Sequence, residues 1–508
     1  MIRLHRLYAL IAVAVLSACA TGPGGESRFD YRLLDEPESG LAYAVRFASE
    51  LQDAEDRAQQ LFAISQHYEE LSKPQEARAL RDFTYEAILA SEDDVPLSAT
   101  ATELAAVYFE QGRTDRTAAL LELAVERISE HSSPLEQARV LEQVIELSFE
   151  GGDELFDVLR VAIEAVFVIE DLNRRVEILV DAVVRYQERG IRQTANSLIQ
   201  QAIPAAGNIS EPWKRAAAYT AIARAYRAME EGERAQRMVD DAISAVEGAE
   251  ALPAEAAGDF LVRLVELDYR AEALDLAERV DRPASRAVVL ARLAETYDTE
   301  ALRSSAFILY SSAASAAGRV EEAGDRARSY TRIAESYMRF GETQLAVIQA
   351  SNAVRTLTRV DSDERDREVM EKLVEVLTTG GATEEIATLS ELADSAEGEA
   401  RLSAYIAVST VGLDEEFAAQ QLERAQDALE SLEGSQNKAG RDIAIAAARL
   451  GRIDEALSQI TTMRDARRIS EAVVVLGVET MRGDGLSDEQ RSRLEEFFRE
   501  YRQRQRLS

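Results

Sequence analysis

A short pattern that ends in tyrosine recurs along this chain of 508 residues. Two copies read Y-T-A-I-A-R-A-Y at 219–226 and Y-T-R-I-A-E-S-Y at 330–337, and looser copies end at Tyr108 and Tyr297. Each tyrosine follows an aliphatic residue by four positions, so the two side chains share one face of a helix. Self-similarity of this kind is the sequence signature of a repeat architecture. We therefore expect stacked helical units rather than one central core.

The residues after each tyrosine predict a second helix in the same unit. Small or aliphatic residues recur at offsets +4, +9, +13 and +16, which after Tyr337 are Gly341, Ala346, Ala350 and Ala353. A glycine at +4 can end the first helix in the left-handed conformation. An alanine at +9 lets two helices cross closely, and the later offsets lie on the buried stripe of the second helix. Each unit is therefore predicted to be a helical hairpin.

Positions equivalent to the tyrosine continue through most of the chain. The predicted series is Tyr68, Tyr108, Phe149, Tyr186, Tyr226, Leu264, Tyr297, Tyr337, Leu377, Val408 and Ala447. Most neighbours in the series are about 40 residues apart, which gives about eleven to twelve hairpins. Leu264, Val408 and the region after 440 match the pattern least well.

The clearest unit resembles the tetratricopeptide repeat (TPR). It contains Tyr330, Ile333, Ala334, Tyr337, Gly341, Ala346 and Ala353. The family prefers an aromatic residue where this unit has Ala350, and Tyr310 supplies one in its own unit. The resemblance implies an all-α, right-handed α-solenoid whose surface binds other proteins. The family period of about 34 residues is shorter than the spacing here, so longer helices or loops are expected.

Helix-capping signals indicate where some of the helices begin and end. Capping boxes stand at 133–136, with proline at the first helical position, and at 487–490. The glycine pairs at 151–152 and 380–381 predict turns between helices. We predict a repeat solenoid over 41–485, which begins with a short helix, and a polar C-terminal capping helix over 486–508.

The first residues of the chain predict export and a lipid anchor. Arg3 and Arg6 precede an apolar run over 7–18 that is too short to span a bilayer, as in a secretory signal. The sequence L-S-A-C at 16–19 resembles the lipobox of bacterial lipoproteins, and Cys19 is the only cysteine. The alternative is an ordinary secretory signal in which Cys19 is incidental. We predict a signal peptide over 1–18, lipid attachment at Cys19 and a flexible tether over 19–40.

The location of the protein is predicted from the same residues. Ala20 follows the cysteine, and by resemblance to the sorting rule of enteric bacteria the absence of aspartate there favours the outer membrane. We therefore expect a lipid-anchored protein of the cell envelope that faces the periplasm. With one cysteine, the fold must rest on packing rather than on disulfides.

The charge of the chain restricts the classes of partner. The formal net charge is −34, and charges of both signs are interleaved along the predicted helices. An acidic surface disfavours nucleic acid, whose phosphates require lysine and arginine, and it also disfavours anionic lipid head groups. We expect envelope proteins or peptides as partners, no nucleic acid, and contact with the membrane only through the lipid on Cys19.

Catalytic and metal-binding motifs are not found in the sequence. His67 and His131 are isolated, and no P-loop, G-x-S-x-G or G-x-G-x-x-G motif occurs. The acidic run at 361–366 lacks the central glycine of a calcium loop and is interpreted as a helix start. Trp213 is interpreted as a packing residue. We predict a protein that is not an enzyme and binds neither a cofactor nor a metal.

Three functions remain open from the sequence. The first is a scaffold, because exposed positions of the first helices vary between units, as in Arg224, Arg227, Glu295, Asp298, Glu335 and Met338. The second is a hydrolytic or lytic enzyme of the cell wall, which requires a cleft with a carboxyl group of shifted pKa. The third is a structural spacer between membrane and wall. We expect the scaffold, which binds other envelope proteins through its solenoid surface.

Overall fold

The computed structural model is built from α-helices. It describes residues 29–91, 97–128, 133–246, 254–297, 302–361, 365–432 and 437–507, and within these ranges there is no β-strand. None of the described helices is both long enough and apolar enough to cross a membrane. The contacts divide the chain into two compact units, Met1–Ser129 with Ser435–Ser508 (unit 1) and Glu130–Gly434 (unit 2). Our prediction was one continuous solenoid over 41–485.

The helices form hairpins, and we call the first helix of each hairpin helix A and the second helix B. Unit 1 contains η1 (Tyr31–Leu33), α2 (Gly40–Ser49), α3 (Ala54–Glu70), α4 (Pro74–Ala90), α5 (Ser98–Glu110), α6 (Thr114–Glu126), α23 (Asn437–Arg449), α24 (Ile453–Thr462), α25 (Ala466–Arg482) and α26 (Asp488–Leu507). Its hairpins are α3–α4, α5–α6 and α23–α24.

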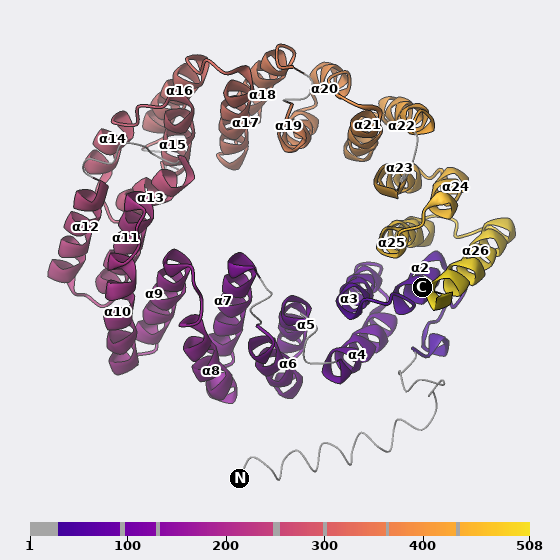
Figure 1. Cartoon of the computed structure of the whole chain (residues 1–508), viewed down its shortest axis with the longest axis horizontal. Helices are drawn as coiled ribbons and strands as arrows, with labels where there is room; N and C mark the ends of the chain where they lie inside the picture. The colour runs from indigo at the N-terminus through magenta and orange to yellow at the C-terminus, as the bar shows by residue number, and fades with distance from the viewer. Residues whose placement is uncertain are drawn as a thin grey trace, which may run out of the picture. The chain divides into compact units, whose positions relative to one another are not determined.

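Unit 2 contains eight further hairpins. Its helices are α7 (Pro134–Glu150), η2 (Gly152–Leu155), α8 (Phe156–Val166), α9 (Leu172–Glu188), α10 (Arg192–Gly207), α11 (Pro212–Ala228), α12 (Gly232–Val246), α13 (Ala254–Glu266), α14 (Arg270–Glu278), α15 (Pro283–Glu295), α16 (Arg303–Gly318), α17 (Ala323–Arg339), α18 (Thr343–Leu357), α19 (Arg367–Thr379), α20 (Thr383–Ser390), α21 (Ala396–Thr410) and α22 (Glu415–Glu430). Odd-numbered helices are the A helices, and each packs on the next A helix. Within unit 2 they lie side by side on the inner side of a curved layer (Figure 1). The predicted all-α solenoid of hairpins is confirmed.

The turn between helix A and helix B has one recurring backbone conformation. In eight hairpins the residue four positions after the tyrosine position is left-handed; these residues are Ser72, Gly112, Gly190, Glu230, Asp268, Gly341, Gly381 and Gly451. The next residue donates its N–H to the carbonyl of the tyrosine position, as from Glu342 to Tyr337 at 2.9 Å. This bond is the Schellman closure of a helix end. The predicted role of Gly341 is confirmed, and three turns reach the same conformation without glycine.

The predicted core positions are buried. Tyr337, Ala346, Ala350 and Ala353 are each at most 5% exposed, as are their counterparts in the other clear units. One position of the series was wrong, because Val408 is only half-buried. Thr410 is fully buried, four positions after the buried Ile406, and takes the tyrosine position in this unit. The turn that follows Thr410 is one residue shorter than the others, which shifts the offsets in that unit.

The two ends of the chain form a composite hairpin in unit 1. Helix α25 is a further A helix, with Leu476, Gly477 and Thr480 in the places of Ile333, Ala334 and Tyr337 of the clearest unit. Its partner is α2, which packs on α25 and then on α3, as a B helix packs on its own A helix and on the next one. Eleven hairpins and this composite pair are present among the described residues.

The C-terminal helix buries an apolar stripe. Leu494, Phe497 and Tyr501 of α26 are at most 4% exposed. The ring of Phe47 in α2 lies 5.7 Å from that of Phe497 and 4.9 Å from that of Tyr501. The predicted capping helix therefore covers α2 with one face, and the capping box at its start is confirmed by reciprocal bonds between Ser487 and Gln490.

Residues 29–39 were predicted to belong to the flexible tether, but they pack against unit 1. Phe29 and Leu34 are each 4% exposed, and the ring of Phe29 meets that of Phe83 edge-on at 5.4 Å. Ser39 caps α2 by accepting a bond from the Ala42 N–H. Phe29 and Leu34 of this segment therefore belong to the hydrophobic core, whereas most of its other residues are exposed.

Candidate functional site

The A helices of unit 2 carry a continuous polar surface. Most neighbouring A helices are linked by an ion pair: Glu146–Arg185 at 2.8 Å, Asp181–Arg224, Asp259–Arg292 at 2.5 Å, Glu295–Arg339 at 2.6 Å and Arg328–Asp366 at 3.2 Å. The last neighbours, α19 and α21, are linked by a hydrogen bond from the Tyr405 hydroxyl to Glu375 at 2.7 Å. We call this set the A-layer ladder.

One arginine of the ladder joins three A helices. Arg263 of α13 donates to the Ala217 carbonyl of α11 at 2.9 Å and reaches Glu177 of α9 at 2.7 Å. The two charged side chains are only 24% and 16% exposed, so water weakens this pair less than a surface pair. The ladder therefore links each A helix of unit 2 to its neighbours.

One carboxyl group on this surface, that of the exposed Glu142, has an altered acidity. Desolvation raises the pKa of Glu142 in α7, Arg174 opposes the increase, and the carboxylates of Glu177 and Asp181 add to it. The carboxyl group thus lies where negative charge is disfavoured.

The sequence left the partner-binding residues unknown, and the varied exposed positions that favoured a scaffold are mostly engaged in ion pairs. Arg224 pairs with Asp181, Glu295 with Arg339, and Glu335 with Arg332. Arg227 is exposed and Met338 is half-buried, while Asp298 lies outside the described residues. The sequence showed that these positions vary but could not show that they pair across repeats.

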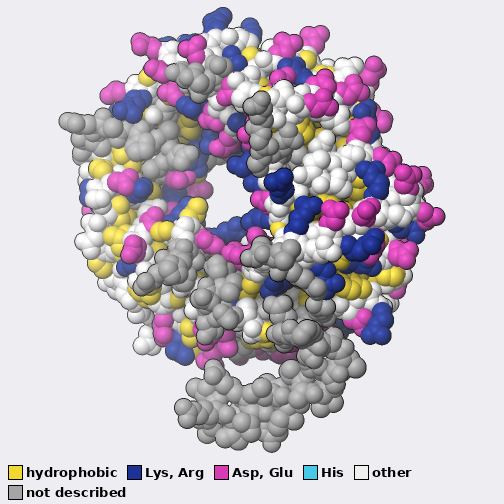
Figure 2. All heavy atoms as spheres, turned by 45° about the vertical axis from the view of Figure 1, so that its right-hand side comes forward, with side chains coloured by type: hydrophobic (Ala, Val, Ile, Leu, Met, Phe, Trp, Pro, Cys, Tyr) yellow, Lys and Arg dark blue, Asp and Glu magenta, His cyan; other side chains and the backbone are white. Residues whose placement is uncertain are grey.

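The polar surface is balanced in charge. The eight A helices of unit 2 contain equal numbers of basic and acidic residues, although the whole chain is strongly acidic. Acidic and basic side chains are mixed over the face seen in Figure 2, as the interleaved sequence predicted. The acidity of the chain thus comes from segments outside the A helices of unit 2.

A recurring arginine was missed in the sequence. Arg57, Arg175, Arg215 and Arg326, each in the second turn of an A helix, donate to the carbonyl of a buried aliphatic residue six positions earlier. The bond from Arg326 to the Val320 carbonyl, for example, is 2.8 Å long. The sequence contains this signal as an aliphatic residue followed six positions later by arginine. The bond connects the loop before helix A to the second turn of that helix.

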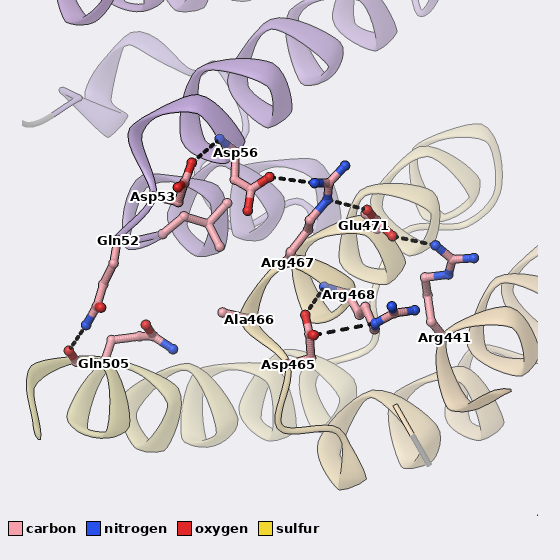
Figure 3. Close-up of a pocket in the computed structure, with 11 residues that line it drawn as sticks. Gln52, Asp53, Asp56, Arg441, Asp465, Ala466, Arg467, Arg468, Glu471 and Gln505 are labelled. Carbon is pink, nitrogen blue, oxygen red and sulfur yellow. Dashed lines mark hydrogen bonds and ion pairs between the residues drawn. The ribbon is translucent and has the colours of Figure 1, made fainter. Parts of the chain in front are cut away.

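A polar cavity of about 570 Å³ lies in unit 1 where the two chain ends meet. Figure 3 shows Arg467 between Asp56 of α3, at 2.8 Å, and Glu471 of its own helix, at 3.1 Å. Arg441 reaches the other side of Glu471 at 2.8 Å. The charged groups at the centre of the cavity thus neutralise one another.

The remaining lining residues close the helix ends around the cavity. Asp53 caps α3 and Asp465 caps α25 through backbone N–H groups. Burial raises the pKa of Asp56, and Arg467 opposes the increase. The side chain of Gln52 donates to the carbonyl of Gln505 at 2.7 Å. Carboxylates of this cavity therefore serve as caps and ion-pair partners.

The other predicted residues have structural environments. His67 contacts Glu70 at 3.1 Å, and Trp213 is buried edge-on against Phe260. Asp366 caps α19, as expected for the acidic run at 361–366. His131 and Cys19 lie outside the described residues. Within the part of the chain that the structure describes, no group of three or more acidic, histidine or cysteine side chains could hold a metal ion.

Comparisons with known proteins find distant likeness at the level of the fold. No protein-family model and no curated protein matches the chain. Among solved structures, Ton1535 from Thermococcus onnurineus NA1 is 14% identical, with 74% of this chain and 99% of that one covered and a TM-score of 0.27. Yeast Tom70 is 13% identical, with 84% and 96% covered and a TM-score of 0.26. The Cut9–Hcn1 hetero-tetramer of APC/C is 12% identical, with 85% and 89% covered and a TM-score of 0.22. The TPR-like fold is assigned from the repeated hairpins of the chain itself.

Proposed function

We propose that this chain is a lipid-anchored scaffold of the cell envelope that binds other envelope proteins through the A helices of unit 2. The A-layer ladder is the observation that carries the proposal. It joins A helices from α7 to α21 into one surface whose side chains are already held in place. A surface that is organised before binding loses less conformational entropy when a partner docks.

The extent of the surface favours a protein or an extended peptide over a small ligand. Small molecules bind in concave, largely apolar pockets with a few polar groups. The A layer instead presents charged side chains that differ from hairpin to hairpin, and solenoids use such surfaces to bind polypeptides. Its balanced charge suits a partner with both signs of charge rather than a purely basic one.

The location is part of the proposal. The apolar run over 7–18, the sequence L-S-A-C and the single cysteine support export and lipid attachment at Cys19. Two or more acyl chains would hold the protein firmly on a membrane, which one chain does not. Ala20 supports the outer membrane, so the A layer would face the periplasm.

We propose a role without catalysis. Glycoside hydrolysis needs one carboxyl group held protonated and a second one across the sugar. In the cavity of unit 1, Asp56 and Glu471 both form ion pairs with Arg467. This pairing supports a structural use of the carboxylates over a lytic one.

The first experiment is an affinity pull-down from native envelopes with the full-length lipidated protein and a Cys19→Ala control. We expect a reproducible set of envelope proteins that the control loses or recovers from another fraction. Enrichment of cell-wall fragments without any protein would contradict the scaffold.

A second comparison tests the surface. The test variant combines Arg227→Glu with Arg332→Glu, two exposed positions of A helices. The control combines Arg237→Glu on the exposed surface of α12 with Arg279→Glu at the end of α14, which makes the same change of charge on B helices. We expect the first variant to lose the partners and the second to keep them. Equal binding by both would exclude the A layer as the site.

A further inference from the structure

We propose that the composite hairpin of unit 1 is a separable clasp, in which α2 leaves α25 and α26 and returns while the other hairpins stay folded. This goes beyond partner binding and depends neither on the lipid anchor nor on the A layer of unit 2. The inference rests on connectivity, on close backbone contact and on a charged rim.

Connectivity distinguishes α2 from the other B helices. Within an ordinary hairpin a short turn such as the one at Gly341 keeps helix B beside helix A. No such turn links α2 to α25, nor to α26, whose Glu495 accepts a hydrogen bond from the Tyr43 hydroxyl at 3.0 Å. The covalent neighbour of α2 is α3, which residues 50–53 join to it. Side-chain and backbone contacts, rather than a covalent turn, therefore hold α2 against α25 and α26.

The centre of the junction is apolar and depends on two glycines. Gly40 of α2 and Gly477 of α25 approach so closely that a Cβ atom on either would lie within 2.9 Å of the other helix. Phe47 of α2 packs among the rings of Phe497 and Tyr501. Release of α2 would separate these contacts as one group and would leave every A–B turn intact.

A rim of ion pairs surrounds this centre. Glu50–Arg502 at 3.0 Å and Glu38–Arg491 at 3.1 Å join acidic residues just after and just before α2 to arginines of α26. Arg46–Glu495 at 3.1 Å has the reverse polarity. These side chains are a fifth exposed or more, so salt weakens the pairs.

Hydrogen exchange of the full chain tests the clasp. Helix α2 is compared with α6, a B helix of the same unit that is joined to its A helix by a short turn. We expect the amides of α2 to exchange faster than those of α6. Raising sodium chloride from about 0.1 M to about 1 M should speed exchange in α2 roughly tenfold and leave α6 unchanged. Exchange of α2 and α6 at one common rate, with one common response to salt, would overturn the proposal.

Matched variants give an independent readout. Arg491→Gln and Arg502→Gln together remove two rim pairs, and we expect faster exchange in α2 alone. The control removes two exposed local pairs of unit 2 by Arg160→Gln and Arg279→Gln. Faster exchange in both α2 and α6 of the rim variant would mean that unit 1 opens only by unfolding, and the clasp would be rejected.

Discussion

Gly40 and Gly477 bring α2 and α25 into backbone contact. A Cβ atom on Gly477 would lie 2.7 Å from the nitrogen and the Cα of Leu41, and one on Gly40 would lie 2.9 Å from the Cα of Gly477. Both neighbours are backbone atoms, which cannot turn away as a flexible side chain can. The absence of side chains at these two positions is what allows the chain ends to join.

Gly477→Ala is therefore expected to destabilise unit 1 by about 1–3 kcal/mol, the range for overpacking a tight interior. The control is Gly440→Ala in α23 of the same unit, where the new methyl group would meet Met463 at an ordinary 3.5 Å. Because alanine is the better helix former, the control should be neutral or stabilising by up to about 1 kcal/mol. Chemical denaturation measures both, and equal effects would contradict the close contact.

The left-handed turns predict opposite effects of two substitutions. Glu230 has φ +62° in the turn where other hairpins have glycine, as at Gly341 with φ +82°. Since a side chain strains this conformation, Glu230→Gly should stabilise the protein by up to about 1 kcal/mol and Gly341→Ala should destabilise it by about 1 kcal/mol. Thermal unfolding of the two variants checks the signs, and a loss of stability in both would show that Glu230 is held by other contacts.

The recurring arginine predicts a measurable loss of stability. Arg215→Gln removes the bond to the Ile209 carbonyl, which is 3.2 Å long. A bond from a charged donor contributes about 1.5–3 kcal/mol, so a loss of about 1–2 kcal/mol is expected for this half-buried example. Arg286 has the same place in its hairpin, after Val280, but no side-chain bond to that carbonyl is seen there. Arg286→Gln is thus the control, and denaturant unfolding should show the smaller loss for it.

The raised pKa of Glu142 predicts that this residue contributes less to folding stability as the pH rises, whereas most carboxylates contribute more. Its pKa is raised in the folded protein, so the native state holds the proton more tightly than the unfolded chain, whose pKa is about 4.3. Its contribution to stability is present below that value and is lost as the pH rises through the folded pKa.

Glu142→Gln should therefore stabilise unit 2 slightly at pH 7, by less than about 0.5 kcal/mol, and the gain should vanish near pH 4. The control is Glu150→Gln at the exposed end of the same helix. Denaturation curves at several pH values test the trend. A gain that persists unchanged at pH 4 would point to packing rather than charge.

Much of the hairpin fold was predictable because its determinants are local. The tyrosine and the aliphatic residue four positions before it define the buried face of helix A, and the alanine at +9 defines where helix B crosses. Tyr337 and Ala346 are buried as this spacing required. The error at Val408 arose where a turn shortened by one residue displaced the register, which a fixed offset could not show.

The candidate site was only partly predictable. Variation among exposed residues indicated that the A helices form a binding surface. Which acidic and basic residues pair, however, depends on how neighbouring hairpins stack on one another. Arg263 meets Glu177 two A helices away, 86 positions earlier in the sequence. A pattern confined to one repeat of about 40 residues cannot indicate a contact between residues 86 positions apart.

By itself, the sequence determined the helical hairpins, their buried faces and many of their turns, because residues within a few helical turns decide these features. Only the tertiary structure decided that α2 completes the hairpin begun by α25. That pairing depends on the close approach of Gly40 to Gly477 and on the mutual burial of Phe47 and Phe497. The sequences of α2 and α25 contain no common pattern that would indicate their pairing.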